Sequence, residues 1–484
     1  MTENNALLPY AFRTNSGQRY IYDVLANRII YFSPSEFDRY EEIMNTFCEQ
    51  GFHLDHIKEK KIYSILRKYS DINNLLANHH DEGRLLYKFK ESEITRVSQL
   101  VLRVTDYCNF SCLYCRYDKK DSDHYQDKPD VLSFDQATKA LDIFFSILNS
   151  EERDTRYGQK IISFYGGEPL LEFDLLKRII DHSRKYRSRD KIKYNLTTNA
   201  SLLNERIIRY FAENKVSLLI SLDGPEKEHN KCRLYKNNEG TYGRVWQNVN
   251  LIRKLNEKYF FKYVSYNAVY TDAHDLLAVK EYFDDSFFKK NTLIASQASD
   301  LEEGFLAKYN LPSFETTYNQ LLNIYKNCLM KKRSISKYLN SLIGSVFNRI
   351  EGRNFSNWKS GLTNIFNCKN VCLPGSSRLY VSTDGNFHVC EKINMHFPIG
   401  DIYRGLDKKK IERMVNQFNK TVLCHCTSCQ AMNLCTACYI PFCVKKKFVI
   451  GNTCEEIRRS IFRDIRDFTS IKEERPDAFK SRSA

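Results

Sequence analysis

Residues 108–115 read Cys108-Asn109-Phe110-Ser111-Cys112-Leu113-Tyr114-Cys115, and they follow an apolar run from Leu100 to Thr105. The run predicts a strand, so the three cysteines lie on the loop that leaves it. Three thiolates at this spacing can hold three irons of a [4Fe-4S] cluster and leave the fourth iron without a protein ligand. An open metal position is where chemistry can occur, as in a catalytic zinc site. A structural zinc site lacking its fourth ligand and a redox dithiol are the alternatives.

The size and composition of the chain predict several packed domains. With 484 residues and a usual domain size of about 150 residues, we expect about three domains. The first residues lack the layout of a signal peptide, and no apolar run approaches the ~18 residues that span a bilayer. We therefore expect a cytoplasmic protein without a membrane partner. Sixteen cysteines then indicate metal sites, because the cytosol keeps thiols reduced.

The formal net charge of +15 indicates that acidic partners are attracted, whether peptide, nucleic acid or anionic surface. The charge alone does not choose among them. Short basic runs such as Lys408-Lys409-Lys410 and Lys445-Lys446-Lys447 are typical of solvated faces.

The N-terminal region predicts a small module of strands and helices. Residues Tyr10 to Phe32 suggest two strands around a turn. A helix is predicted to follow, with Ser33 as N-cap, Pro34 at the first helical position and Glu36 completing a capping box. Helical spacing then continues to about Ala77.

Strand and helix patterns alternate from about Gln99 to Lys331. The strand candidates are Leu100 to Thr105, Ile161 to Tyr165, Ile192 to Thr197, Val216 to Leu222, Phe261 to Val269 and Thr292 to Ser296. Six such repeats predict an α/β fold with a parallel sheet, most plausibly an incomplete barrel. Sites of such sheets form at the C-terminal ends of the strands. Helices are predicted from Leu311 to Arg353, with Tyr318, Leu321, Leu322 and Tyr325 in the core.

Polar motifs stand at the ends of three of these strands. The second strand ends in Gly166-Gly167-Glu168, where glycines allow close backbone approach to a ligand and the carboxylate can accept hydrogen bonds from an ammonium group. The third ends in Thr198-Asn199-Ala200 and the fourth in Ser221-Leu222-Asp223-Gly224-Pro225, followed by His229 and Arg233. A tight turn, a helix cap at Asp223 and a structural role for His229 are the alternatives.

These motifs together resemble the radical S-adenosylmethionine (radical SAM) enzymes. The CxxxCxxC signature includes an aromatic residue, Tyr114, before the third cysteine. The resemblance implies that Cys108, Cys112 and Cys115 hold a [4Fe-4S] cluster whose free iron chelates SAM. It further implies a set of cofactor contacts at Tyr114, Gly166, Gly167, Glu168, Asn199, Ser221 and Arg233. Ala200 stands where the family has Gly, which is one departure from the pattern.

The C-terminal cysteines resemble the SPASM extension of peptide-modifying radical SAM enzymes, which holds two auxiliary iron-sulfur clusters. The resemblance implies a first cluster on Cys368, Cys372, Cys390 and Cys438. It implies a second on Cys426, Cys429, Cys435 and Cys454. The spacing Cys435-x2-Cys438 is one residue shorter than in the family, so Cys424 and Cys443 are rivals for one position. Two zinc ribbons are the alternative, because Cys-x2-Cys pairs suit zinc.

These motifs predict three domains. Residues 1–95 resemble the winged-helix-like precursor-recognition module that is fused to many peptide-modifying enzymes. We further predict a partial (β/α)6 radical SAM barrel at 96–331 and a Cys-rich SPASM domain at 332–484. In the first module an extended leader peptide would add a strand to the sheet edge. A cap that only packs on the catalytic domain is the alternative.

The chemistry implied by the resemblance is radical modification of a peptide. A 5′-deoxyadenosyl radical from SAM removes a hydrogen atom from an unactivated carbon, and the protein places that carbon. The leading hypothesis is a maturase of a ribosomally made peptide of the Cys-rich or Bacteroidales type, which forms thioether links. The alternatives are a C–C cross-linking enzyme, an epimerase, an anaerobic sulfatase maturase and a zinc-containing nucleic-acid-binding protein. The leading hypothesis expects a precursor peptide, an electron donor such as flavodoxin or ferredoxin, and no nucleic acid.

Overall fold

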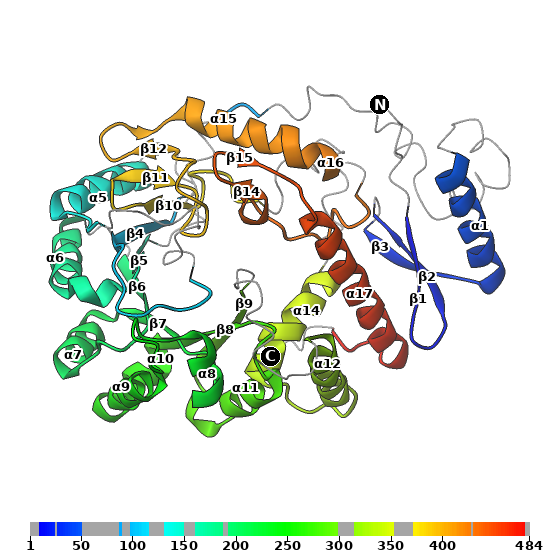
Figure 1. Cartoon of the computed structure of the whole chain (residues 1–484), viewed down its shortest axis with the longest axis horizontal. Helices are drawn as coiled ribbons and strands as arrows, with labels where there is room; N and C mark the ends of the chain where they lie inside the picture. Colours follow the sequence, from blue (N-terminus) through cyan, green and yellow to red (C-terminus); the bar gives the residue numbers. More distant parts are fainter. Residues whose placement is uncertain are drawn as a thin grey trace. The chain divides into compact units, whose positions relative to one another are not determined.

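The structure is a computed structural model of the whole chain (Figure 1). It describes residues 9–24, 27–50, 87–89, 97–115, 130–149, 160–186, 192–298, 314–352, 371–426 and 429–479. The chain forms two compact units. The sheet unit comprises Phe89–Ser345 and Cys372–Glu412, and the terminal unit comprises Met1–Lys88, Val346–Val371 and Arg413–Ala484.

Six parallel strands form the main part of the sheet unit. They are β4 (Gln99–Thr105), β5 (Lys160–Gly166), β6 (Ile192–Thr198), β7 (Ser217–Ser221), β8 (Val264–Tyr270) and β9 (Thr292–Gln297). They pair in chain order, and every pair is parallel. Six of the seven residues of β4 are buried, as expected of a strand covered on both faces. The predicted parallel α/β sheet is confirmed.

Helices between the strands cover the outside of this curved sheet (Figure 1). They are α5 (Phe134–Leu148), α6 (Phe173–Ser183), α7 (Glu205–Asn214), α8 (Glu226–Cys232), α9 (Tyr242–Leu255), α10 (Glu257–Tyr263) and α11 (Leu276–Phe283). A capping box is present at the start of α5, with Ser133 and Gln136 bonded reciprocally. Phe144 and Phe145 of α5 are buried, and each such side chain contributes roughly 1.5–3 kcal/mol.

One predicted strand boundary is wrong. The strand expected from Phe261 begins at Val264, because residues Glu257–Tyr263 form α10. The side chain of Asn256 caps this helix by accepting a hydrogen bond of 2.9 Å from the Tyr259 amide. The aromatic run in this helix indicated a strand in the sequence, but here Tyr259 and Phe260 supply the buried face of a short capped helix.

Strands from the cysteine-rich region extend the same sheet. They are β10 (Arg378–Val381), β11 (Asn386–His388), β12 (Gly400–Asp401) and β13 (Gly405–Leu406). β10 pairs with β4 in parallel, and the others follow in antiparallel order. The resulting sheet has ten strands. The sequence did not predict this extension, since its strands are short and their partner lies far away in the chain.

The remaining α-helices follow β9 in the chain. They are α12 (Phe314–Met330), α13 (Lys337–Leu339), α14 (Ser345–Glu351), α15 (Lys408–Phe418), α16 (Cys424–Cys426) and α17 (Thr453–Glu474). The four residues of α12 predicted to face the core are buried. A short hairpin of β14 (Cys443–Val444) and β15 (Lys447–Phe448) precedes α17.

The N-terminal part of the terminal unit is a three-stranded antiparallel sheet followed by a helix. Its elements are β1 (Tyr10–Arg13), β2 (Arg19–Asp23), β3 (Arg28–Phe32) and α1 (Pro34–Gln50). The sequence predicted two strands here, which is wrong by one. A second turn before β3 contains Asn27 at φ +48°, whose side chain accepts a 2.7 Å hydrogen bond from the Tyr22 hydroxyl. The predicted helix beyond residue 50 lies outside the described residues.

This small sheet packs against the C-terminal helix of the same unit. Tyr10 stacks on Phe462 with ring centroids 3.6 Å apart. The hydroxyls of Thr14 and Ser16 donate to the Glu473 carboxylate at 2.8 and 2.7 Å. The two ends of the described chain are therefore held together within one unit.

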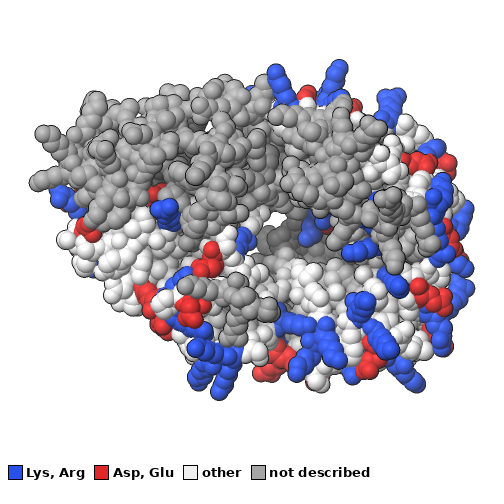
Figure 2. Space-filling view, turned by 180° about the vertical axis from the view of Figure 1, so that it is seen from behind, with Lys and Arg blue, Asp and Glu red and all other residues white. Residues whose placement is uncertain are grey.

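The described surface carries both signs of charge, with Lys and Arg side chains spread widely and Asp and Glu among them (Figure 2). Within the described part of the chain, no helix combines the length and the apolar character needed to cross a membrane.

Candidate active site and cysteine groups

The cysteine loop is attached along its length to the segment that follows α8. The amides of Ser111 and Leu113 donate to the carbonyls of Leu234 and Cys232 at 2.8 and 2.9 Å. Cys108, Cys112 and Cys115 are each partly buried. These backbone hydrogen bonds hold the cysteine loop in place without a contribution from a ligand.

Two glycines at the end of β5 let the neighbouring chain approach this loop. A Cβ on Gly166 would lie 2.3 Å from the carbonyl oxygen of Thr105, and one on Gly167 would lie 2.1 Å from that of Tyr107. The amides of Gly167 and Glu168 donate to these same two carbonyls at 2.9 and 2.8 Å. The sequence suggested close approach to a ligand, and the structure shows close approach to the backbone that enters the cysteine loop.

Glu168 is buried and accepts three hydrogen bonds. They come from the Leu170 amide at 3.0 Å, the Thr198 hydroxyl at 2.7 Å and the Asn199 amide at 2.7 Å. Burial raises the pKa of this carboxyl above its usual value, although the three donors act in the opposite direction. A cationic ligand group would compensate the buried charge.

The end of β6 is linked to the cysteine loop through side-chain amides. The Asn199 amide donates to Asn109 at 2.9 Å and reaches the Cys108 sulfur at 4.0 Å. Asn109 in turn donates to the Ser201 hydroxyl at 2.9 Å. Ala200 has φ +63°, a left-handed conformation that explains why a glycine suits this position in related sequences. Asn109 and Ser201 were not singled out in the sequence.

A buried polar triad joins the cysteine loop to the end of β7. The Tyr114 hydroxyl donates to Asp223 at 2.5 Å and accepts from Arg233 at 2.6 Å. Burial raises the Tyr114 pKa well above its usual value, so the phenol stays protonated. The Nε of Arg233 is buried without a hydrogen-bond partner among the described residues. An acceptor such as a carboxylate or a ribose oxygen would satisfy it.

His229 has a structural role, which was one of the two interpretations of this residue in the sequence. Its Nδ1 accepts from the Asp223 amide at 3.3 Å, and its Nε2 contacts the Thr241 hydroxyl at 3.0 Å. Burial lowers its pKa well below the usual value. The neutral ring thus connects two backbone segments, and Asp223 caps no helix here, since its oxygens bond Tyr114 and the Val269 amide.

The predicted site residues converge at one edge of the sheet. Glu168 follows β5, Asn199 follows β6 and Ser221 ends β7, all at C-terminal strand ends, where sites of parallel sheets form. Burial raises the pKa of the Cys108 thiol to about 12, and the pKa of Cys112 is raised for the same reason. Three thiolates at these partly buried positions would need a positively charged partner, which the irons of a cluster would supply.

Four cysteines of the terminal unit surround a second position. They line a cavity of about 120 Å³ and are Cys426, Cys429, Cys435 and Cys454. Burial raises the pKa of Cys426 to about 12, and the neighbouring thiols act in the same direction. Arg458 also lines the cavity and lowers the pKa of Cys454 electrostatically, although burial dominates. These four cysteines are the set that the resemblance assigned to one auxiliary cluster, and that assignment stays a prediction.

The other predicted auxiliary set is only partly described. Cys372 and Cys390 belong to the sheet unit, Cys438 belongs to the terminal unit, and Cys368 lies outside the described residues. The rival Cys424 donates its thiol to the Lys420 carbonyl at 2.9 Å. The assignment of Cys368, Cys372, Cys390 and Cys438 stays a prediction.

Among the described residues, no three His, Cys, Asp or Glu side chains converge closely enough to bind a single metal ion. A structural zinc needs four ligands around one ion, whereas each iron of a cluster takes its own thiolate.

Comparisons with known proteins agree with this site. The model of the Radical SAM superfamily matches residues 102–271, which contain the cysteine loop and the ends of β5 to β7. The radical SAM cyclopropyl synthase TigE of Paramaledivibacter caminithermalis is 24% identical over 303 residues, covering 60% of this chain and 54% of TigE. The chain thus spans about half of the length of that relative.

Two further similarities concern sequence and fold. The cysteine-type anaerobic sulfatase-maturating enzyme of Clostridium novyi is 24% identical over 307 residues, covering 61% of this chain and 73% of that enzyme. The solved structure of native anSMEcpe with bound AdoMet has a TM-score of 0.56 at 19% identity, over 78% of this chain and 97% of the other. That structure supports the shared fold alone.

The fold and the site define a radical SAM domain. Residues 102–271 match the Radical SAM superfamily, and the cysteine loop and the ends of β5 to β7 lie within that match. The chain is similar in sequence to a radical SAM cyclopropyl synthase and to an anaerobic sulfatase-maturating enzyme.

Proposed function

We propose that this chain matures a ribosomally made precursor peptide and forms thioether links from a Cys sulfur to a carbon. The observation that carries the proposal is the presence of two cysteine groups of different kinds. One is a three-cysteine loop among buried charged residues, and the other is a four-cysteine cavity in the unit that contains the N-terminal sheet. A peptide modification that removes two electrons requires a group that starts the radical reaction and a second group that accepts an electron. The two cysteine groups are our candidates for these two roles.

At the first group, Cys108, Cys112 and Cys115 would hold the cluster that cleaves SAM and supplies a hydrogen-abstracting radical. The other residues would bind and orient the SAM molecule. Glu168 offers a buried carboxylate for its ammonium group, and the unpaired Nε of Arg233 offers a donor for an oxygen atom. Tyr114 and Asp223 would fix the guanidinium of Arg233.

The remaining proposed contacts lie at the same edge of the sheet. Ser221 stands at the last position of β7, and the Asn199 side chain holds Cys108 and Asn109. Asn199 would therefore act by orienting the cysteine loop, while Gly166 and Gly167 keep that loop close to β5.

Thioether formation requires an electron acceptor. Joining a carbon to a Cys sulfur removes one hydrogen from each, so the product loses two hydrogens. One leaves as a hydrogen atom, and the other leaves as a proton and an electron. The group of Cys426, Cys429, Cys435 and Cys454 is our candidate holder of the acceptor, and Arg458 supplies positive charge beside it.

The N-terminal sheet is our candidate for leader recognition. β3 is an edge strand in the described sheet, and Tyr31 on it is 52% exposed. An extended peptide can add to such an edge by backbone hydrogen bonds. Because this sheet packs on α17, a leader bound there would be attached to the unit that carries the four-cysteine cavity.

A second candidate function is favoured by the comparisons. The sulfatase-maturating relative aligns over 73% of its own length, so oxidation of a Cys or Ser in a sulfatase peptide is the alternative. It would remove two hydrogens from one residue without a cross-link.

Mass spectrometry distinguishes these functions. We would incubate the anaerobically reconstituted enzyme with SAM, a reductant and the small Cys-containing peptide encoded nearest its gene. Loss of hydrogen pairs, with protected thiols and blocked fragmentation, would support thioether linkage. Solvent deuterium gain without cross-linking would indicate epimerisation. An unchanged peptide despite 5′-deoxyadenosine release would favour a sulfatase peptide, which the same assay then tests.

Leader recognition has its own test. Tyr31→Glu places a charge on the exposed edge strand, and we expect at least about tenfold weaker leader binding by fluorescence anisotropy, or about 1.4 kcal/mol. Tyr403→Glu, at a tyrosine that is 69% exposed in the sheet unit, is the matched control. Equal leader affinity in both variants would mean that the N-terminal sheet is only a cap.

A further inference from the structure

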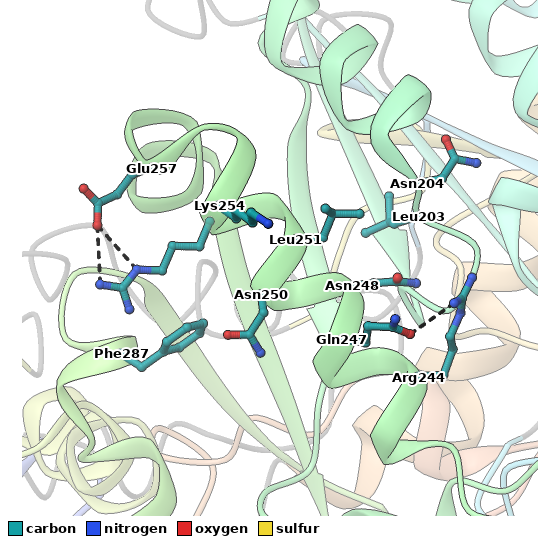
Figure 3. Close-up of a pocket in the computed structure, with 11 residues that line it drawn as sticks. Leu203, Asn204, Arg244, Gln247, Asn248, Asn250, Leu251, Lys254, Glu257 and Phe287 are labelled. Carbon is teal, nitrogen blue, oxygen red and sulfur yellow. Dashed lines mark hydrogen bonds and ion pairs between the residues drawn. The ribbon is translucent and has the colours of Figure 1, made fainter.

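A groove runs along α9 on the sheet unit (Figure 3). Its volume is about 780 Å³. Its lining residues come mainly from α9, from the loop before α7 and from Phe287, which lies shortly before β9. Figure 3 shows Arg244, Gln247 and Asn250 along the helix, with Leu203 and Asn204 on the loop. The site described above uses none of these side chains.

The lining of the groove contains basic and apolar side chains. Its cations are Arg244, Arg253 and Lys254, and Glu257 is the acid among them, which pairs with Arg253 at 3.4 Å. The guanidinium of Arg253 lies 4.9 Å from the ring centre of Phe287. This contact holds the charge in place above apolar surface. Such a composition suits a transient interface with an acidic protein, because surface charge steers association and a small apolar centre adds affinity.

Two lining residues of the groove are hydrogen-bonded to the turn that contacts the cysteine loop. The Arg244 Nε donates to the Ser201 carbonyl at 3.0 Å, and the Asn248 amide donates to the Ala200 and Ser201 carbonyls at 2.8 and 2.9 Å. The Ser201 hydroxyl donates to the Asn199 side chain at 2.7 Å. The Asn199 amide reaches the Cys108 sulfur.

A continuous set of hydrogen bonds thus connects the groove with a proposed cluster ligand, and the turn at residues 199–201 separates the two. An electron can cross such a bonded wall, whereas a peptide carbon cannot reach the reacting position through it. This distinction favours a redox partner over a substrate.

We propose that the groove is the docking site of an acidic one-electron carrier protein. The reduced carrier would lose one electron, the cluster that Cys108, Cys112 and Cys115 would hold would gain it, and no atom would be transferred. The proposal rests on reductive SAM cleavage as described under the proposed function. A chemical reductant, which needs no docking site, tests that activity separately.

The test compares two sources of electrons in one charge-reversed enzyme. Arg253→Glu with Lys254→Glu reverses two cations that make no hydrogen bond to the 199–201 turn. We would measure 5′-deoxyadenosine release with flavodoxin, its reductase and NADPH, and separately with dithionite. We expect the flavodoxin-supported kcat/KM to fall at least about tenfold, while the dithionite-supported rate stays unchanged. The flavodoxin rate of the unmodified chain should also fall steeply with salt.

A matched control reverses two exposed cations elsewhere on the sheet unit. Lys177→Glu with Lys185→Glu on α6 and the turn after it makes the same change in net charge. Equal losses in both double variants would overturn the proposal, because net charge alone would then explain them. Unchanged flavodoxin rates, or equal losses with flavodoxin and dithionite, would also overturn it.

Two further outcomes distinguish a failure of electron-carrier docking from a failure of reductive SAM cleavage. A loss confined to peptide affinity would assign the groove to an acidic substrate and overturn electron-carrier docking. An unmodified chain that cleaves no SAM with dithionite would overturn the radical chemistry itself. If the double variant fails to fold, Lys254→Glu alone, at an exposed side chain, carries the same comparison.

Discussion

The two described cysteine groups are surrounded by different chemistry. The loop of Cys108, Cys112 and Cys115 lies among buried ionisable groups, with Glu168, Asp223 and Arg233 all at least 94% buried. The cavity of the other four cysteines is lined mainly by apolar side chains such as Phe418, Val422 and Ile457, with Arg458 as its ionisable neighbour. Similar ligands are thus placed in two kinds of environment.

This difference indicates different tasks. A group that must bind and release a charged small molecule needs fixed donors and acceptors beside the metal. A group that only passes electrons needs a full set of ligands and a medium that sets its potential. The surroundings of each group therefore say more about its role than the cysteines themselves do.

The sharpest test of the comparison removes one ligand of the first group. Cys112→Ala should lose about four irons per chain and leave no detectable 5′-deoxyadenosine release. The auxiliary iron should remain, because its ligands are untouched. Iron and sulfide analysis with chromatography of the nucleoside checks this. Retained SAM cleavage would refute the assignment of the loop.

The reciprocal change removes one ligand of the second group. Cys435→Ala should abolish the cross-linked peptide, because the released electron has no acceptor, while SAM cleavage without peptide continues. Mass spectrometry and 5′-deoxyadenosine analysis on the same sample separate the two effects. Normal product formation would mean that the four-cysteine cavity serves stability alone.

A glycine substitution tests how the first loop is held. Gly167→Ala would place a Cβ against the Tyr107 carbonyl, and we expect a loss of about 3 kcal/mol in unfolding free energy with less iron on the loop. Gly243→Ala is the control, since nothing lies within 4 Å of its Cβ and alanine favours a helix by about 1 kcal/mol. Urea unfolding that showed both variants equally stable would contradict the close approach.

The buried His229 predicts a pH effect with a definite sign. Its folded pKa is lowered, so the unfolded chain binds a proton below pH ~6.5 that the folded chain does not. Its contribution to stability is therefore lost as the pH falls below about 6.5, by about 1.4 kcal/mol per pH unit. His229→Gln keeps a donor and an acceptor but does not titrate. Urea midpoints at pH 7.5, 6.5 and 5.5 should show a shallower slope for the variant, and parallel slopes would contradict this.

The smallest expected effect concerns backbone strain beside the cysteine loop. Ala200 has φ +63°, so Ala200→Gly should stabilise the fold by up to about 1 kcal/mol. Lys215→Gly, at φ +54° after α7, should behave alike and serves as the comparison. Destabilisation at residue 200 but not at 215 would show that the Ala200 side chain contributes packing that outweighs the strain.

Local patterns predicted much of this structure. The six parallel strands and the placement of Glu168, Asn199 and Ser221 at strand ends follow from short-range sequence periodicity and turn residues. The four-cysteine group followed from a resemblance in spacing. These features depend on neighbours in the chain, which the sequence shows directly.

The errors and omissions depend on tertiary context. Residues 261–263 are helical because they belong to α10, which Asn256 caps and which is held by its buried aromatic residues Tyr259 and Phe260. The links between Asn109 and Ser201, and between Tyr114 and Arg233, join residues 92 and 119 positions apart. No local pattern predicts such pairs, since polar side chains show no periodicity that identifies their partners.

The pairing of β10 with β4 has a consequence for how the chain matures on the ribosome. The carbonyl of Ser377 accepts the amide of Ser98 at 3.0 Å, across 279 positions of sequence. Until β10 has been synthesised, one edge of β4 has no partner strand, and an open apolar edge is prone to wrong pairing. Translation must therefore pass the radical SAM segment and reach the cysteine-rich region before the sheet is complete. Truncation before residue 378 should yield a chain that depends on chaperones to stay dispersed.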